Sequence, residues 1–337
     1  MKKRVLYIGN ALSNKGATVT SVETLGIFLK DEGYEMKIAS SKKNRIVRLL
    51  DMIFHVIIFK RKTDYVLIDT YSTTNFWYAV IVGRLCSFFK LPYIPILRGG
   101  DLPKRFRKSP KHTLKLFENA YRNIAPSSYM ISSFEKEGFT NLTYIPNTIE
   151  IKNYSFVERR QLKPKLLWVR SFSEIYNPLM ALKVLKKLLI NFPEATLTMV
   201  GPEKDNSYQE CLAFAEANNL PVTFTGLLSK EEWIALAASH DIFISTTNFD
   251  NTPVSVIEAM ALGLPVVSTN VGGMPFLIEH TKDGLLSPPR EVASFVLAIT
   301  RVLKEPILAQ SLAENARSKV EHFDWNSVKK KWEEVLS

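Results

Sequence analysis

The fold class is decided by the stretch Ser245-Thr-Thr-Asn-Phe-Asp-Asn-Thr-Pro-Val-Ser-Val-Ile-Glu-Ala-Met-Ala-Leu-Gly-Leu-Pro-Val-Val-Ser268. Short apolar runs at 242–245 and 265–268 are typical of buried strands, and the segment 253–262 between them has the pattern of a helix. A strand, a helix and a second strand in this order form a unit whose two strands are parallel.

The start of this helix predicts a phosphate site. Thr252 is a good N-cap and Pro253 suits the first helical position, while Gly263 supplies the C-terminal stop. The first amides of the helix, at Val254 and Ser255, have no partner within it, and the helix dipole favours an anion there.

The alternation of apolar strands and helices continues in both directions along the chain. It predicts an α/β protein of two Rossmann-like lobes with parallel sheets. The break at 155–165 divides it into a first lobe, 1–160, and a second lobe, 161–323. The other expected strands are 4–8, 36–39, 65–68, 93–97, 166–169, 196–200 and 222–225, and the other expected helices are 20–30, 46–59, 75–88, 111–121, 178–190, 207–218 and 229–238.

Composition excludes several classes of protein. With 337 residues, 46% of them hydrophobic and 23% charged, the chain fits a globular protein of two domains and not a disordered one. No apolar run reaches the roughly 18 residues of a membrane-spanning helix, and the short run 5–8 is no signal-peptide core. We therefore expect a cytoplasmic protein in which Cys86 and Cys211 are buried thiols.

The net charge of +11 is unevenly distributed. Residues 1–155 hold 25 Lys and Arg against 12 Asp and Glu, a net of +13, which leaves a net of −2 for 156–337. Basic segments at 45–62 and 104–111 pair cations with apolar side chains, which favours an anionic membrane surface as a partner. The alternative for 45–59 is a core helix with solvated, charged ends. No nucleic-acid-binding signature accompanies the charge, so we expect no nucleic-acid partner.

Two carboxylates of the opening stretch are candidates for binding sugar hydroxyls. Glu258 lies among apolar residues of the helix, where a charge needs a partner. A carboxylate accepts hydrogen bonds from both hydroxyls of a ribose diol, and Asp250 could serve a second sugar in the same way. The alternatives are a buried salt bridge for Glu258 and a solvated loop acid for Asp250.

The run Asp250-x7-Glu258-Ala-Met-Ala-x-Gly263-x-Pro-Val-Val267 resembles the acidic-x7-Glu motif of family 4 glycosyltransferases, the retaining enzymes of GT-B fold. The resemblance extends in order over nearly the whole chain, through Gly16 with Glu23, Ala125-Pro-Ser127, Ile145-Pro-Asn147, Gly226, Val271-Gly-Gly273 and Asp283-Gly-Leu-Leu286.

This resemblance implies that the lobe 1–160 binds the acceptor and is completed by the helix 324–337, and that the lobe 161–323 binds the donor. It also implies a role for each matching residue. Glu258 would hold the ribose of a nucleotide sugar, Asp250 the hydroxyls of the donor sugar, and Arg170, after the strand 166–169, the diphosphate. Gly16 corresponds to the opening glycine loop of the family, and Gly226 with Leu227 to the loop that meets the base.

The chain also departs from the family at three positions. Asp250 stands for the usual glutamate, and no lysine follows Arg170 by six residues. No histidine lies in Arg98-Gly-Gly-Asp101, which leaves Asp101 as the one ionisable acceptor there that could orient or deprotonate the acceptor hydroxyl. Gly-Gly-Asp is also an ordinary turn.

We therefore predict a metal-independent retaining glycosyltransferase that moves a sugar from a nucleoside diphosphate sugar to a glycan or lipid-linked acceptor, in bacterial surface polysaccharide or glycolipid synthesis. No Asp-x-Asp, His-x-x-x-His or Cys-x-x-Cys metal pattern occurs, and no Gly-x-Gly-x-x-Gly follows the first strand. We expect no cofactor besides the donor. The alternatives are a sugar phosphorylase or hydrolase on the same fold and a catalytically silent nucleotide-sugar-binding protein.

Overall fold

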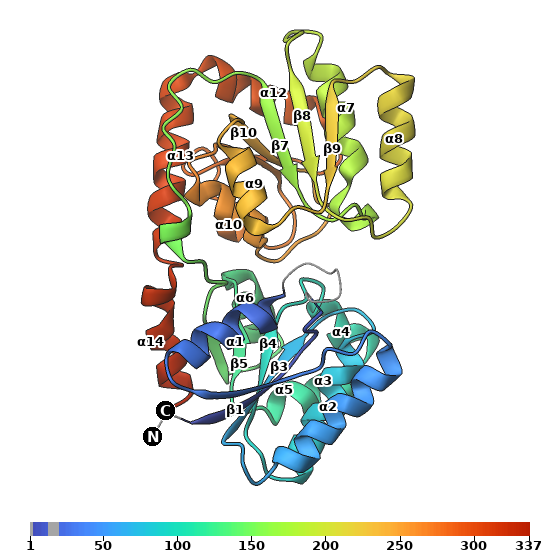
Figure 1. The fold of residues 1–337 in the computed structure, drawn as a ribbon, viewed down its shortest axis with the longest axis vertical. Helices are drawn as coiled ribbons and strands as arrows, with labels where there is room; N and C mark the ends of the chain where they lie inside the picture. The colour runs from blue at the N-terminus through green and yellow to red at the C-terminus, as the bar shows by residue number, and fades with distance from the viewer. Residues whose placement is uncertain (1–2, 13–19) are drawn as a thin grey trace. The chain divides into compact units, whose positions relative to one another are not determined.

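Residues 3–12 and 20–337 are described by a computed structural model, in which the chain divides into two compact units. The first unit comprises Met1–Pro146 and Val328–Ser337, and the second comprises Asn147–Ser327. In Figure 1 each unit is a sheet with helices against its faces. Each has a Rossmann-like α/β architecture, as predicted.

The first unit is built on a six-stranded parallel sheet of order β2-β1-β3-β4-β5-β6. Its strands are β1 Arg4–Ile8, β2 Glu35–Ala39, β3 Tyr65–Thr70, β4 Tyr93–Leu97, β5 Asn123–Ala125 and β6 Leu142–Tyr144. Its helices are α1 Ser21–Asp31, α2 Arg45–Phe59, α3 Phe76–Phe88, α4 Pro103–Lys108, α5 Pro110–Glu118, α6 Ser128–Glu135 and most of α14 Trp325–Val335.

The second unit repeats this plan with the order β12-β11-β10-β7-β8-β9, again parallel. Its strands are β7 Lys165–Val169, β8 Thr196–Val200, β9 Val222–Gly226, β10 Ile242–Ser245, β11 Val266–Thr269 and β12 Leu285–Ser287. Its helices are α7 Pro178–Leu188, α8 Ser207–Ala217, α9 Lys230–Ala237, α10 Val254–Ala261, α11 Met274–Leu277, α12 Val292–Lys304 and α13 Pro306–Glu321.

The strand order of the second unit creates a switch point between β7 and β10. From β7 the chain adds β8 and β9 on one side, and from β10 it adds β11 and β12 on the other. Residues that follow β7 and β10 therefore meet at one edge of the sheet, where open parallel sheets bind their ligands.

Alternation along β7 explains how the sheet of the second unit is buried on both faces. Leu166 and Trp168 belong to one apolar cluster, and Leu167 and Val169 pack with another. Successive side chains of a strand point to opposite faces, so a strand covered by helices on both sides is apolar throughout.

Residues 147–160, which the sequence predicts for the first lobe, pack with the second unit. Ile149 and Tyr154 belong to an apolar cluster of that unit, and Arg317 Nη1 donates to the carbonyl of Tyr154 at 2.6 Å. A break in the strand and helix pattern therefore marks the start of β7 and not the boundary between the units.

The structure also bears on membrane-spanning helices, on the basic segment 104–111 and on three short strands. No helix in residues 3–12 and 20–337 is both long and apolar enough to cross a membrane. The basic segment 104–111, most of which lies outside the helices expected from the sequence, is helical except at Ser109, because Pro103 and Pro110 begin α4 and α5 at positions where proline is favoured. Strands β5, β6 and β12 have three residues each and are too short for a periodic pattern, so the sequence did not predict them.

Candidate functional site

Arg170 follows β7 directly and lies at the switch point of the second unit. Its amide donates to the carbonyl of Val200 at 3.0 Å, which extends the pairing of β7 with β8 by one residue. Gly201 has φ +149°, and a Cβ there would lie 1.8 Å from the carbonyl oxygen of Arg170. Only glycine allows this approach, so Gly201 fixes where the arginine leaves the sheet.

The guanidinium of Arg170 pairs with the carboxylate of Asp250, which is contributed by the loop after β10. It also lies 4.4 Å from the centre of the Tyr176 ring. Burial lowers the pKa of Arg170, but the neighbouring Asp250 more than offsets this, so the pKa stays above its ordinary value. A permanently charged guanidinium that is only partly buried can bind an anion.

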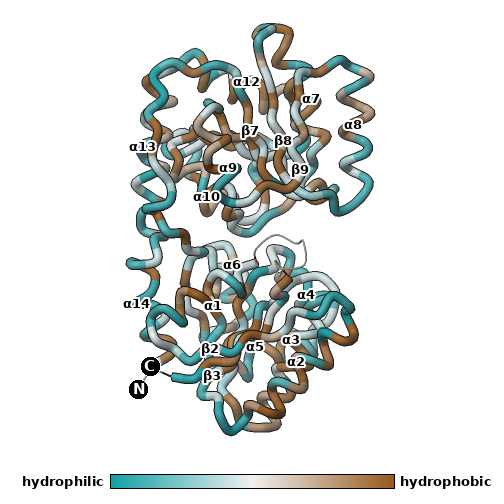
Figure 2. The backbone as a smooth tube through the Cα atoms, in the orientation of Figure 1, coloured by the Kyte–Doolittle hydropathy of each residue, from teal (hydrophilic) through white to brown (hydrophobic). Residues whose placement is uncertain are grey.

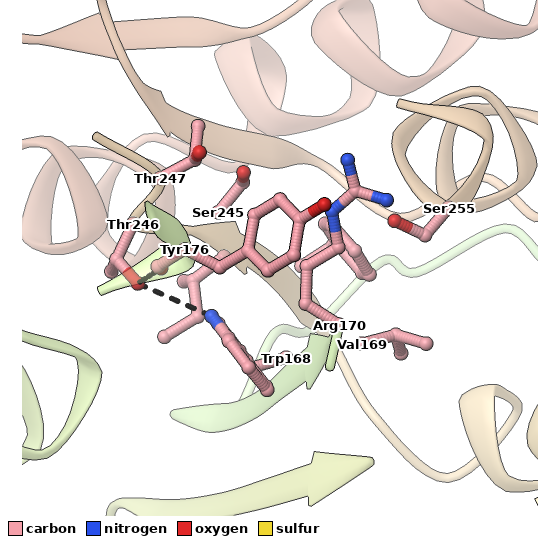
Figure 3. Close-up of a pocket in the computed structure, with 10 residues that line it drawn as sticks. Trp168, Val169, Arg170, Tyr176, Ser245, Thr246, Thr247 and Ser255 are labelled. Atoms are coloured by element: carbon pink, nitrogen blue, oxygen red, sulfur yellow. Dashed lines mark hydrogen bonds between the residues drawn. The ribbon is translucent and has the colours of Figure 1, made fainter. Parts of the chain in front are cut away.

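Arg170 lines a small pocket (Figure 3). Ser255, from the first turn of α10, also lines it, so the pocket lies where a helix start and a strand end meet. Trp168 lines it as well, and its indole donates to Thr246 Oγ1 at 3.2 Å. The other lining residues are Val169, Tyr176, Phe243, Ile244, Ser245 and Thr247.

Two glycines position the loop that carries Asp250. Gly272 has φ +54° and a Cβ there would lie 2.3 Å from the carbonyl oxygen of Asp250, while one at Gly273 would lie 1.9 Å from that of Asn251. The amide of Gly273 donates to the backbone carbonyl of Asp250 at 2.9 Å. The Val-Gly-Gly sequence after β11 thus allows the backbone contact that fixes the Asp250 loop.

Helix α10 begins one residue later than predicted. Its N-cap is Pro253, and Thr252 does not cap it; the Oγ1 of Thr252 is buried and has no hydrogen-bond partner among the described residues. The first bonds within the helix are donated by the amides of Val256 and Ile257 to Pro253. The amides of Val254 and Ser255 precede them, as expected for an anion-binding helix start.

Glu258 is 3% exposed and has two partners in the second unit. Its Oε1 accepts from the Tyr154 hydroxyl at 2.7 Å and pairs with the ammonium of Lys230. Burial, and then the charge of Glu258, raise the pKa of Tyr154 far above its ordinary value, so the tyrosine stays a donor. The ion pair with Lys230 matches the buried salt bridge that the sequence analysis gave as one interpretation of Glu258. The carboxylate still has lone pairs that can accept hydrogen bonds from a ligand.

Tyr154 and Lys230 are site residues that the sequence did not identify. Tyr154 lies in a segment expected in the other lobe. Lys230 begins α9, where the capping box of Ser229 and Glu232 fixes the helix start. A capping box is a sequence pattern that marks the first residue of a helix. Here it places Lys230 at the start of α9, shortly after Gly226 and Leu227, and it is the signal that could have identified this lysine.

The other predicted residues fall in three places. Gly226 ends β9 in the second unit with φ +71°, and Leu227 beside it is 45% exposed. Asp101 lies in the first unit, where Lys104 Nζ is 2.9 Å from its Oδ2 and its Oδ1 is buried without a hydrogen bond among the described residues. Gly16 lies outside the described residues.

A buried polar network at the strand ends of the first unit also escaped the sequence analysis. Asp69, at the end of β3, accepts from the Tyr7 hydroxyl at 2.9 Å and from Arg98 Nε at 3.1 Å. Burial raises the pKa of Asp69 in spite of the opposing charge of Arg98.

The described residues contain no group of three or more His, Cys, Asp or Glu side chains placed to hold a metal ion.

Comparison with known proteins identifies the family of the chain. Residues 151–319 match the family model described as "Glycosyl transferases group 1". A sulfoquinovosyl transferase of Arabidopsis thaliana is 30% identical over 151 residues, 44% of this chain and 29% of that protein. A galactosyltransferase of Escherichia coli, named for UDP-Gal and an α-D-GlcNAc-diphosphoundecaprenol, is 22% identical over 287 residues, 77% of this chain and 72% of that protein.

A solved structure also resembles the whole chain. A sucrose-phosphate synthase of Thermosynechococcus elongatus superposes with a TM-score of 0.82 at 17% identity, over 99% of this chain and 98% of that one. The predicted GT-B fold is thereby confirmed. The chain spans less than a third of the length of the Arabidopsis relative.

Proposed function

Because its residues 151–319 match that family model, the chain belongs to the glycosyl transferases group 1 family, and we propose that it transfers a sugar from a nucleoside diphosphate sugar to an acceptor. One observation carries the proposal. Arg170, the Asp250 loop and the start of α10 meet in the second unit, so a cation, a carboxylate and the first turn of a helix converge at one switch point.

In the proposed donor complex each group takes the part its chemistry suits. Glu258 accepts from the ribose hydroxyls, and Arg170 with the first amides of α10 binds the diphosphate. Since Arg170 pairs with Asp250, donor binding exchanges this partner for phosphate oxygens and frees the Asp250 carboxylate for sugar hydroxyls. Gly226 and Leu227 border the base. Donor binding is thus an exchange of charge partners within one unit.

We propose that the reaction retains the anomeric configuration and needs no metal ion. Negative charge grows on the diphosphate as it leaves, and Arg170 and the helix amides are preorganised donors at that position. They would take the part that a divalent ion plays in other transferases. Asp101, held by Lys104, would orient the acceptor hydroxyl from the first unit.

For the acceptor we propose a glycan or a lipid-linked glycan at the inner face of the cell membrane, in bacterial surface polysaccharide or glycolipid synthesis. The E. coli relative is named for a diphosphoundecaprenol acceptor, which supports this class. The surplus of 25 basic against 12 acidic residues in the first 155 suits an acceptor that carries phosphate.

The test is transfer from a panel of UDP and GDP sugars to lipid-linked and soluble glycan acceptors, with and without EDTA. We expect transfer that survives EDTA, and NMR of the new glycosidic bond should show the anomeric configuration of the donor. Restoration by magnesium of an EDTA-inactivated sample would refute the metal-free mechanism. A need for inorganic phosphate would indicate a phosphorylase, release of free sugar a hydrolase, and binding without turnover a silent protein.

A further inference from the structure

Helix α2 is firmly placed in the first unit. The side chain of Asn44 caps it, accepting from the amides of Ile46 and Val47 at 2.9 and 3.2 Å. On its inner face Met52 and Val56 belong to the core of the unit. The guanidinium of buried Arg48 binds the carbonyls of Lys42 and Lys43 at 2.7 and 2.8 Å, which fixes the approach to the helix.

The opposite face of α2 is also apolar, yet it is exposed. Ile46, Leu50, Phe54 and Ile58 recur at intervals of four residues and form one stripe, of which Ile46 is 71% and Phe54 57% exposed; Ile57 beside it is also exposed. Figure 2 shows the brown, hydrophobic colour along this helix. A helix that is apolar on all sides is normally buried on all sides, so this stripe indicates a partner outside the unit.

Positive charge flanks this stripe at both ends. Lys42, Lys43 and Arg45 precede or begin the helix, and Arg61 and Lys62 follow it, and all five are exposed. The one acidic residue of the helix, Asp51, is half-buried and lies 3.7 Å from the His55 ring. Cations around an apolar face match a surface that offers hydrocarbon below and negative charge above, which is an anionic lipid layer.

The same charges argue against a second copy of the chain as the partner. Two α2 faces brought together would place the cationic ends of both helices close to each other, with no acidic residue of the stripe to neutralise them. An anionic bilayer meets both the apolar and the charged requirement.

The other basic segment is less available than the sequence suggests. Lys104 pairs with Asp101, and the Arg105 guanidinium binds the carbonyls of Ser72 and Thr73 at 2.5 and 2.9 Å and lies 4.8 Å from the Phe76 ring. Two of the cations expected to meet lipid are thus engaged within the first unit. Of the two predicted basic segments, α2 is therefore the stronger candidate for contact with lipid.

We propose that the exposed face of α2 docks the protein on an anionic bilayer, with Leu50, Phe54 and Ile58 entering the boundary between headgroups and acyl chains. The inference rests on the proposed function for its purpose, since a lipid-linked acceptor lies in that membrane.

The first experiment is flotation of the full chain with vesicles of phosphatidylcholine containing phosphatidylglycerol, or of phosphatidylcholine alone. We expect binding to the anionic vesicles at low salt, and at least tenfold weaker binding for the variant Leu50→Gln/Phe54→Gln/Ile58→Gln. The matched control is Ile190→Gln/Leu297→Gln/Ile307→Gln, which alters apolar residues of the second unit that are even more exposed than those of α2 and should bind like the wild type. Equal binding by both variants would overturn the proposal.

A second measurement reports insertion directly. Both native cysteines are buried, so a Phe54→Cys variant can be labelled selectively with a polarity-sensitive dye, and Ile307→Cys provides the control. Anionic vesicles should shift the emission of the dye at position 54 to the blue and leave that at 307 unchanged. No shift at 54, or a dimer in sedimentation that the α2 variant abolishes without any vesicle binding, would refute docking on lipid.

Transfer to a water-soluble acceptor separates this inference from the proposed function. The α2 variant should retain that activity, because none of its changed residues belongs to the donor site. Vesicle binding without any transfer by the wild type would reject the proposed function and leave the docking surface standing. Transfer without vesicle binding would reject the docking surface and leave the proposed function standing.

Discussion

Arg170 and Asp250 form an ion pair although 79 residues separate them in sequence, because each follows one of the two strands that meet at the switch point of the second unit. In the absence of a ligand the two charges neutralise each other. In the proposed donor complex the diphosphate replaces Asp250 as the partner of Arg170, so mutation of either residue should have a distinct effect.

Replacing Arg170 by alanine should lower kcat by about 100-fold or more, because it removes a charge that stabilises the leaving diphosphate. Arg170→Lys keeps the charge without the planar fork and should recover part of the loss. Steady-state kinetics measure both, with circular dichroism as the control for folding. An alanine variant with wild-type kcat would contradict the role.

Asp250→Asn should have a different effect. The change releases Arg170 from its partner, so affinity for free UDP or GDP should stay equal or rise, whereas transfer should fall because the sugar hydroxyls lose a charged acceptor. Calorimetry with the free nucleotide and with the nucleotide sugar distinguishes the two. A loss of nucleotide affinity as large as that of Arg170→Ala would be inconsistent with this exchange of partners.

Glu258→Gln should weaken nucleotide and nucleotide-sugar binding together. Hydrogen bonds to a charged group contribute about 1.5 to 3 kcal/mol, so the dissociation constants should rise by roughly 10- to 150-fold. Tyr154→Phe is the control, since it removes a neighbour of the carboxylate and leaves the carboxylate in place. If Tyr154→Phe weakened binding as much as Glu258→Gln, the glutamate would act through packing and not through the ribose.

Gly201→Ala should destabilise the second unit far more than Gly226→Ala. Both glycines have positive φ, but a Cβ at 201 would lie 1.8 Å from the Arg170 carbonyl, whereas one at 226 would meet nothing within 4 Å. Gly226→Ala should therefore cost only the conformational term of about 1 to 2 kcal/mol. Thermal unfolding of the two variants makes the comparison, and equal losses would show that the close approach at 201 relaxes freely.

The stability of the second unit should fall as the pH drops below about 6.5, partly because of His240. The ring nitrogens lie 2.9 Å from the Leu236 carbonyl and 2.8 Å from Thr198 Oγ1, and burial lowers the pKa of His240. The unfolded chain then binds a proton in a pH range where the folded chain does not, so stability is lost as pH falls through that range. Melting curves at pH 7.5 and 5.5 should show a smaller drop for His240→Gln, and an identical drop would exclude the histidine.

Local sequence alone predicted most of the longer strands and helices, but not α12 or α13, and it predicted which side chains follow strand ends. Apolar periodicity and caps act over a few residues, so Arg170 after β7 and the helix with Glu258 after β10 were readable without a structure. The predicted start of α10 was nevertheless one residue too early, because Pro253 occupies the N-cap position and not the first helical position.

Only the tertiary structure decided which of these groups meet. Strand order depends on packing between distant segments, and it is the placement of β10 beside β7 that brings Asp250 to Arg170. Long-range contacts likewise bring Tyr154 and Lys230 to Glu258, although neither lies in a motif with it. Apolar periodicity also predicted a helix at α2 but could not tell which of its two apolar faces is covered. A local pattern records the preference of a side chain for burial, whereas the neighbours that satisfy or leave open that preference are supplied by the rest of the chain.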